Sequence, residues 1–311
     1  MPQADSQRKA RCIGEDWSRC RPGVTMAGMR AGIVSNCFKS QLDAGESLSG
    51  LIGRATACGF SVIELRQGCL GDGESSGELV PDPDNLEALA ESCPGVCWDL
   101  ALGYPCFDPA TTGDDVVFSA GRTSIERLAH GGPPHLRLVD LTTDHSRVDT
   151  ADAAATVGRL FERVRDVGGM LSIEHARENW EWFSEVFARA RDNAGEDGQW
   201  LKICFDPCNL LMAPGHPDPA KVTAELDPET VSMVHVKQRR NGQPWPAVAD
   251  GEVDWAGVIE AMGAMGDGAG FDGPVLFEVA PSRDVWEFLE GSRVYLQRLG
   301  LEMGLDTQGR E

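Results

Sequence analysis

Short apolar runs alternate along the chain with longer segments in which apolar residues recur at helical spacing. The first unit has an apolar run at residues 31–38, a helical segment at 48–58 and a second apolar run at 60–66. Gly59 follows the helical segment and suits a left-handed helix end. The unit is typical of two neighbouring parallel strands, because the connection between such strands crosses over through a helix.

The same unit repeats toward the end of the chain. Further strands are predicted at residues 96–101, 135–141, 170–174, 202–206, 231–236 and 275–279. Further helices are predicted at residues 85–93, 115–130, 151–167, 178–191, 219–225, 255–265 and 285–299. Eight strand–helix pairs are what a (β/α)8 barrel requires.

No linker rich in Pro, Ser or Gly divides residues 30–300, and no unit is left over for a second domain. The main alternative, an open doubly wound sheet, needs a Gly-rich turn after an early strand, which the sequence does not have. We therefore predict an α/β protein with a single (β/α)8 TIM barrel at residues 29–300. A flexible N-terminal extension (1–28) and a C-terminal tail (301–311) are expected on either side of it.

Composition and charge exclude several classes of partner. Apolar residues make up 41% of the chain, which is ordinary for a soluble globular protein. The 28 basic and 49 acidic residues give a net charge of −21, so we expect neither nucleic acid nor a membrane as partner. There is no apolar run long enough to cross a bilayer and no secretory signal, so a cytoplasmic location is expected. The ten scattered cysteines do not form a disulfide or structural zinc pattern.

Four predicted strands end on a residue that can bind a metal. These residues are Glu174, Asp206, His235 and Glu278. Because the carboxyl ends of barrel strands converge on one face, we expect the four side chains to meet there. One strand-end carboxylate alone would more often be a helix cap or a surface charge, whereas four in successive units indicate a metal site.

Three carboxylates and one imidazole form a donor set dominated by oxygen. Such a set suits one divalent cation, for which Mn²⁺ is the first choice and Mg²⁺, Co²⁺ or Zn²⁺ are alternatives. Four protein ligands leave two positions of an octahedral ion free, so that a substrate could chelate through a carbonyl and an adjacent hydroxyl. The cation would then stabilise the enediolate formed when a proton leaves the carbon next to the carbonyl.

The order Glu, Asp, His, Glu at the ends of strands five to eight resembles the xylose isomerase-like barrel superfamily, particularly its sugar phosphate isomerase/epimerase group. The resemblance covers roughly residues 30–300 and is supported by GFSVIE (59–64), DPCNL (206–210), HVK (235–237), DGEVDW (250–255) and GFDGPVLFE (270–278). It implies a metal-dependent isomerase or epimerase of a keto sugar or related small hydroxy-carbonyl compound. In that family the two metal-bound glutamates, here Glu174 and Glu278, also form the acid/base pair. Family members often form dimers or tetramers, which leaves a homo-oligomer open.

The chain departs from the family pattern at two positions that concern the substrate rather than the metal. Asn209 stands where the epimerases commonly have a His that contacts substrate, and Gln238 stands where they have an Asp. We assign to substrate binding the residues Glu64, Arg66, Asn209, Lys237, Arg239 and Trp245.

Several of these residues have a structural alternative. Glu64 and Arg66 could form an internal ion pair, and Arg239 could be a solvated loop charge beside Arg240. Strand alternation would turn Lys237 and His175 away from the metal, toward the barrel wall.

Two aromatic features also have two readings. Trp245 lies between two prolines in the long loop expected after His235 and is the candidate pocket lid. Trp180 either closes the apolar side of a pocket or packs in a helix with Trp182 and Phe183.

Three other functions are alternatives. A dehydratase or lyase on a keto sugar or a dehydroshikimate-like substrate would share the proton abstraction and differ in expelling a leaving group. An apurinic endonuclease of the same superfamily needs many metal-binding histidines, whereas this chain has six His in all and a strongly negative charge. A non-catalytic sugar-binding barrel would predict a broken metal quartet, and the quartet is complete.

Overall fold

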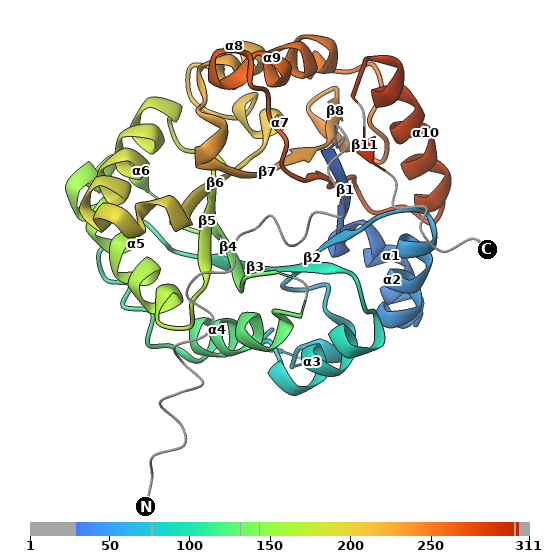
Figure 1. Cartoon of the computed structure of the whole chain (residues 1–311), viewed down its shortest axis with the longest axis horizontal. Coiled ribbons are helices and arrows are strands. Elements are labelled where there is room, and N and C mark those ends of the chain that lie inside the picture. The colour runs from blue at the N-terminus through green and yellow to red at the C-terminus, as the bar shows by residue number, and fades with distance from the viewer. Residues whose placement is uncertain (1–28, 76, 131, 143, 302, 305–311) are drawn as a thin grey trace, which may run out of the picture.

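The barrel closes through eight parallel strands. In the computed structural model, which describes residues 29–75, 77–130, 132–142, 144–301 and 303–304, these strands form a ring with helices around it (Figure 1). The strands are β1 (Met29–Val34), β2 (Val62–Arg66), β3 (Cys97–Tyr104), β4 (His135–Asp140), β5 (Met170–Glu174), β6 (Leu201–Phe205), β7 (Val231–Val236) and β10 (Val275–Phe277). Each pairs with the next in chain order, and β10 pairs with both β7 and β1. The predicted (β/α)8 barrel is confirmed.

The helices lie outside the ring and turn their apolar faces toward the strands. They are α2 (Leu48–Ala57), α3 (Pro83–Ser92), α4 (Val116–Leu128), α5 (Thr150–Arg165), α6 (Trp180–Ala194), α8 (Pro219–Glu225), α9 (Trp255–Gly268) and α10 (Val285–Arg298). Two further helices are short: α7 (Pro207–Leu210) begins just after β6, and α1 (Lys39–Asp43) follows a 3₁₀ turn at the end of β1. Most helices begin after a Ser, Asp or Asn whose side chain accepts a backbone N–H of the first turn, for example Ser47 and Asp149.

The first predicted strand is shorter than expected. We predicted a strand over residues 31–38, but β1 ends at Val34 and a 3₁₀ turn covers Ser35–Phe38. Ser35 Oγ accepts the backbone N–H of Arg66 at 2.8 Å. The Ser35 hydroxyl thus accepts a hydrogen bond from the end of β2, and the chain leaves the strand earlier than the apolar pattern indicates.

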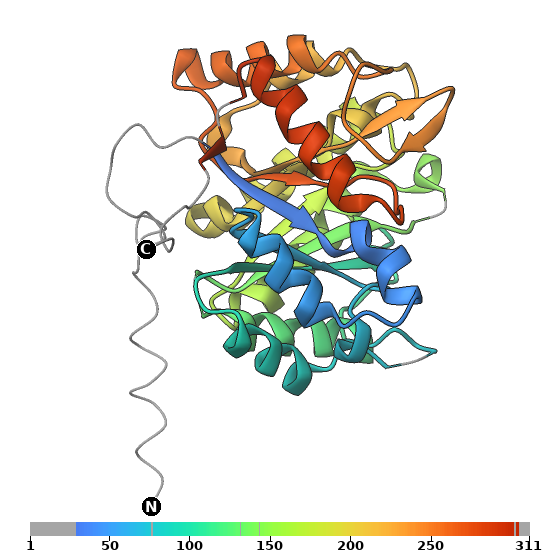
Figure 2. The ribbon, with the colours of Figure 1, turned by 90° about the vertical axis from the view of Figure 1, so that its right-hand side faces the viewer.

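The loop that was expected after His235 is an ordered hairpin. Strands β8 (Gln238–Arg240) and β9 (Gln243–Trp245) pair antiparallel. Asn241 and Gly242, between the strands, both have positive φ, 51° and 72°, which is the requirement of a tight type I′ turn. In the side view the hairpin projects beyond the barrel on the face toward which β1 points (Figure 2).

The interior of the barrel contains an apolar layer at one level and a polar layer nearer the carboxyl ends of the strands. The apolar layer is made by five neighbouring strands, β2, β1, β10, β7 and β6, through Val62, Val34, Leu276, Met233 and Cys204. The helices pack on the outside of the ring and complete a much larger core. The polar layer lies beneath the mouth of the barrel, and most of its side chains are buried.

Two predictions at the chain ends concern residues that are mostly outside the described part. The predicted extension (1–28) lies outside it, as do residues 302 and 305–311 of the predicted tail. Of the remaining tail residues, Leu301 and Met303 are buried, and β11 (Met303–Gly304) pairs with β1. Within the described part of the chain, the helices are too short or too polar to cross a membrane.

Candidate metal centre

The four predicted metal ligands come together at the carboxyl end of the barrel. Glu174 is the last residue of β5, Asp206 follows β6, His235 lies in β7 and Glu278 follows β10. One donor atom of each lies within 4.8 Å of the donor atoms of the other three, and all four residues are buried. The geometric expectation from the sequence is therefore met: the four side chains form one cluster.

The turn after β6 explains how Asp206 is presented. Pro207 cannot continue the strand, and it is well suited to the first turn of α7. Asp206 Oδ1 accepts the backbone N–H groups of Cys208, at 2.9 Å, and Asn209, at 3.2 Å. Its other oxygen, Oδ2, remains directed into the cluster.

His235 turns its two ring nitrogens to different neighbours. Nδ1 lies 3.3 Å from Glu278 Oε2 and 3.6 Å from Glu174 Oε1. It has no hydrogen-bond partner among the described residues, although the side chain is completely buried. A buried nitrogen with carboxylate oxygens beside it and no hydrogen bond is a good position for a metal ligand.

Two buried cations accompany the acidic cluster. Arg137 of β4 donates to Glu174 Oε2 and to both oxygens of Glu64, the contact from Nε to Glu64 Oε2 being 2.9 Å. Lys237 Nζ lies 2.5 Å from Asp206 Oδ2 and 3.0 Å from Glu278 Oε2.

These contacts leave an excess of negative charge in the cluster. Four carboxylates (Glu64, Glu174, Asp206 and Glu278) face two permanent cations, while burial and the charge of Glu64 raise the pKa of the nearby Asp99 well above its ordinary value, so Asp99 is not counted. Four negative charges minus two positive charges leave two negative charges, which is the charge that one divalent cation balances. The donor set, the free Nδ1 and the charge excess therefore all fit a divalent metal.

The same charges set the protonation of the ligands. Burial alone would raise the pKa of Glu174 and of Glu278, but Arg137 beside the first and Lys237 beside the second hold both pKa values below the ordinary value. Burial raises the pKa of Asp206 to about 6, with the charges of Glu174 and Glu278 adding to the rise and Lys237 opposing it. Glu174 and Glu278 are therefore kept as carboxylates at neutral pH.

Asn209 and Lys237 are predicted substrate-binding residues that lie at the quartet, as does Glu64, whose Oε2 is 3.4 Å from His235 Nε2. Asn209 Nδ2 donates to Glu174 Oε1 at 3.1 Å and to the backbone oxygen of His175 at 2.8 Å. The expectation that alternation turns Lys237 away is wrong, because Lys237 is two residues after His235 and side chains two residues apart point to the same face. His175 does turn away and packs against Trp180 and Phe183.

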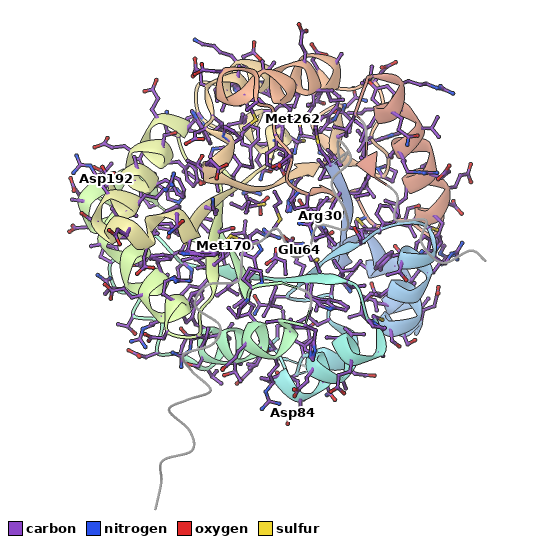
Figure 3. The ribbon with its side chains drawn as sticks, in the orientation of Figure 1. Arg30, Glu64, Asp84, Met170, Asp192 and Met262 are labelled. Atoms are coloured by element: carbon purple, nitrogen blue, oxygen red, sulfur yellow. The ribbon has the colours of Figure 1, made fainter. Side chains whose placement is uncertain are left out.

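Glu64 and Arg66 do not pair with each other. Glu64 is fully buried inside the ring of strands, where Figure 3 labels it, and its ion pair is with Arg137. Arg66 ends β2 and is only partly buried. Sequence reasoning thus named the right kind of contact for Glu64 and the wrong partner.

Arg239 and Trp245 take part in the hairpin. Arg239 Nη1 contacts Met212 Sδ at 2.8 Å, and its Nε lies 3.8 Å from Glu252. The guanidinium of Arg240 lies over the Trp245 ring, 4.8 Å from its centroid. Neither residue has a described contact with the quartet, so their assignment to substrate binding stays a prediction.

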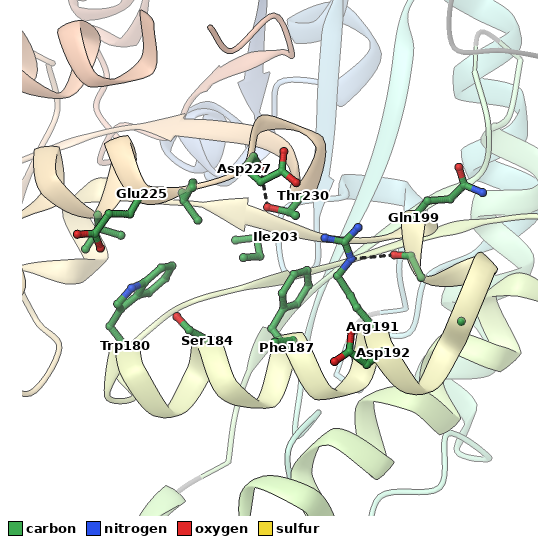
Figure 4. Close-up of a pocket in the computed structure, with 15 residues that line it drawn as sticks. Trp180, Ser184, Phe187, Arg191, Asp192, Gln199, Ile203, Glu225, Asp227 and Thr230 are labelled. Carbon is green, nitrogen blue, oxygen red and sulfur yellow. Dashed lines mark hydrogen bonds between the residues drawn. The ribbon is translucent and has the colours of Figure 1, made fainter. Parts of the chain in front are cut away.

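Trp180 belongs to the outer wall of the barrel. It stacks on Phe183 and lines a groove of about 720 Å³ between α6 and the segment from α8 to Thr230 (Figure 4). Trp182 packs edge-on against Phe107. These contacts correspond to the helix-packing alternative for Trp180, Trp182 and Phe183.

Arg137 is missing from the predicted site, although the sequence contains one indication of its role. The predicted strand at 135–141 begins His, Leu, Arg, Leu. His135 and Arg137 therefore lie on one face of the strand, and the leucines lie on the other. The apolar face packs on helices, and the polar face therefore points into the barrel. A charged residue in that position needs a buried partner, which Glu64 and Glu174 supply.

A second group of possible donors, Glu64, Cys204 and His235, lies beside the quartet. It is the poorer metal site. Burial raises the pKa of the Cys204 thiol to about 12, so the sulfur remains protonated, and both oxygens of Glu64 are already bonded to Arg137.

Comparisons with known proteins support the fold. Neither protein-family profiles nor curated protein sequences give a match to the chain. Among solved structures, the IolI protein with a bound zinc atom has a TM-score of 0.62 at 12% identity, covering 88% of this chain and 96% of that chain. L-ribulose 3-epimerase has a TM-score of 0.58 at 14% identity, with coverages of 88% and 96%. A xylose isomerase domain containing protein from Salmonella typhimurium LT2 has a TM-score of 0.60 at 15% identity, with coverages of 88% and 100%.

The similarity extends over nearly the whole length of each of these proteins, while the identities are low. It therefore concerns the path of the chain rather than particular side chains. The fold expected from the order of strand-end residues in the sequence agrees with this similarity. The chain has the fold of the xylose isomerase-like TIM barrels.

Proposed function

We propose that the protein is a divalent-metal-dependent isomerase or epimerase of a keto sugar or a related small hydroxy-carbonyl compound. The observation that carries the proposal is the buried quartet of Glu174, Asp206, His235 and Glu278 at the carboxyl end of the barrel. Enzymes with this architecture have their active sites at that end. Solved structures with the same fold include L-ribulose 3-epimerase and a D-tagatose 3-epimerase-like protein.

The four quartet residues are the proposed ligands of one metal ion, with Mn²⁺ as the first choice and Mg²⁺, Co²⁺ or Zn²⁺ as alternatives. The zinc atom bound to the IolI protein shows that a related fold can hold such an ion. When bound, the cation would supply Lewis acidity toward the carbonyl and hydroxyl oxygens of the substrate.

Glu174 and Glu278 are the proposed proton-transfer residues. Both are kept ionised by neighbouring cations, so either can accept a proton from a substrate carbon. Asn209 holds Glu174 Oε1, and Asn36 Nδ2 holds Glu278 Oε1 at 3.2 Å. Because the two carboxylates come from β5 and from the end of β10, with β6 and β7 between them, they can approach a substrate from two directions.

The remaining predicted substrate residues form the proposed surroundings of the substrate. Lys237 lies at the quartet with part of its side chain exposed, and its ammonium can donate to a substrate oxygen. Arg66, Arg239 and Trp245 are proposed as outer contacts. Glu64 is fully buried and paired with Arg137, and we do not propose it as a direct substrate contact.

The proposal is tested by hydrogen exchange. The metal-free protein is loaded with Mn²⁺, then exchanged to Mg²⁺ for NMR, and incubated in D₂O with a panel of ketoses, ketose phosphates and small hydroxy-ketones. Deuterium is expected at the carbon beside the carbonyl of at least one compound. Glu174→Gln and Glu278→Gln should each abolish the exchange, and Glu185→Gln, an exposed change on α6, should preserve it.

The outcomes separate the alternative functions. Loss of a β-substituent, seen as a new unsaturated product, would replace the isomerase by a dehydratase or lyase. Metal and sugar binding without exchange would favour a non-catalytic sugar-binding barrel. Exchange that persists in both glutamine variants would contradict the assigned proton-transfer residues.

A further inference from the structure

We propose that Glu64 is a positioning residue for the metal ligand His235. Held by Arg137, Glu64 accepts the hydrogen on His235 Nε2 and so keeps Nδ1 directed toward Glu174 and Glu278. The inference rests on the proposed metal centre. It gives Glu64 a role different from the substrate contact expected from the sequence.

Complete burial and an ion pair with Arg137 hold the Glu64 carboxylate in place. The Glu64 side chain is 0% exposed and that of Arg137 is 1% exposed, so the two groups form a buried ion pair. Arg137 Nε donates to Glu64 Oε2 at 2.9 Å, and Nη2 donates to Oε1. A planar guanidinium that bonds both oxygens fixes the plane of the carboxylate, which a lysine could not do.

The position of the imidazole follows from its two sets of neighbours. His235 Nε2 lies 3.4 Å from Glu64 Oε2, whereas Nδ1 lies 3.3 Å from Glu278 Oε2 and 3.6 Å from Glu174 Oε1. Histidines that bind metals usually donate their second ring N–H to a carboxylate or carbonyl, which fixes the tautomer and the ring orientation. Glu64 is the carboxylate on that second side.

Cys204 is the other neighbour of Nε2, and it is the weaker candidate. Its sulfur also lies 3.4 Å from Nε2. The thiol is buried in the apolar layer and remains neutral, so it is a weak acceptor compared with an ionised carboxylate.

Arg137 joins this contact to the rest of the quartet. The same guanidinium that fixes Glu64 also donates to Glu174 Oε2. Arg137 therefore holds one proposed ligand directly and a second one, His235, through Glu64. The contacts form a closed ring, because His235 Nδ1 faces Glu174 in turn. The members of this ring are Arg137, Glu64, His235 and Glu174.

The test is a double-mutant cycle on metal affinity. Metal-free wild-type protein, Glu64→Gln, His235→Gln and the double variant are titrated with Mn²⁺ by calorimetry. Glu64→Gln should weaken binding about 10- to 100-fold, and it should cause little further loss when His235 is already Gln. Cys204→Ser should stay within a few-fold of wild type. Ser172→Ala is the control, since Ser172 is fully buried but bonds His135 and Ser232.

Two results would overturn the inference alone. One is a Glu64→Gln protein that binds Mn²⁺ as tightly as wild type, and the other is an equal loss from Glu64→Gln in both backgrounds. Wild-type protein that takes up no Mn²⁺ would instead overturn the proposed function, and this inference with it.

A second measurement does not depend on any variant folding. Nitrogen-15 NMR of the Zn²⁺-loaded wild-type protein should show His235 with its hydrogen on Nε2 and its metal on Nδ1. A hydrogen on Nδ1, or a metal on Nε2, would overturn the positioning role of Glu64.

Discussion

Lys237 is placed to compete with a metal ion for two of its proposed ligands. Its ammonium lies 2.5 Å from Asp206 Oδ2 and 3.0 Å from Glu278 Oε2. In the metal-free protein this cation offsets the repulsion between the carboxylates. When a divalent ion binds the same oxygens, two positive groups then stand close together.

Removing the Lys237 charge should therefore strengthen metal binding. We expect Lys237→Met to bind Mn²⁺ about 10-fold more tightly, equivalent to about 1.4 kcal/mol. The same variant should have a lower melting temperature without metal, since Asp206 and Glu278 lose their buried cation. Calorimetric titration and thermal unfolding measure both effects. Lys221→Met, an exposed change on α8, serves as control, and weaker Mn²⁺ binding by Lys237→Met would contradict this account.

Arg137 is the residue on which the buried charges depend most. Arg137→Met leaves Glu64 and Glu174 without their buried partner, which typically costs about 3–5 kcal/mol. Urea unfolding of the metal-free protein should show this loss. Adding Glu64→Gln to Arg137→Met should restore part of the stability, because one of the two unpaired charges is then gone. An Arg137→Met protein as stable as wild type would show that the ion pairs contribute little.

At the residue scale, the members of the quartet could be predicted from the sequence better than their partners. Asp206 could be placed because proline ends its strand at a defined residue, and strand ends of a barrel converge. The partner of Glu64 could not be placed, since Arg137 lies 73 positions further along the chain. Such a contact follows from the inward direction of two strands, which sequence spacing does not give.

At the element scale, β1 connects the packing of the barrel to Glu278. Ile33 lies opposite Phe277 in the β1–β10 pair, and Asn36 just beyond β1 donates to Glu278. Gly32 permits the close approach of β1 to its neighbours. A Cβ at this position would lie 2.7 Å from Leu276 Cγ and 2.9 Å from the backbone oxygen of Val62.

Gly32→Ala should therefore destabilise the protein by about 1–3 kcal/mol, because the backbone oxygen cannot move aside without disturbing the β1–β2 pair. Chemical unfolding measures the change. Gly53→Ala is the matched control: it lies in α2, and a Cβ added there would have no described atom within 4 Å, so the exchange should stabilise by about 0.5–1 kcal/mol. A Gly32→Ala protein as stable as the wild type would contradict the close packing.

The elements themselves were largely predictable, and the exceptions have local causes. Helix α8 and strand β7 have the predicted bounds, since apolar periodicity and the surrounding proline and acidic residues define both. The hairpin of β8 and β9 was not predicted, although Asn241–Gly242 is a common turn pair. The prolines on either side of Trp245 suggested a loop. Among the described strands β9 pairs with β8 alone, so a proline is tolerated at this edge.

At the scale of the whole molecule, the chain carries an excess of negative charge, and part of it is buried inside the barrel. The net charge is −21, and four carboxylates with two cations lie in the interior near the mouth. Burying like charges is costly unless a cation balances them. The fold could be predicted from repeating units, whereas the charge balance required the packed interior.

The central claim is that this interior binds one divalent metal ion. Elemental analysis of the purified protein, with Glu174→Gln and His235→Ala beside it, tests the claim most directly. We predict about one Mn, Mg, Co or Zn per chain in the wild type and loss of that metal in both variants. A folded wild-type protein that contains no metal, and takes up none from added Mn²⁺, would contradict the claim.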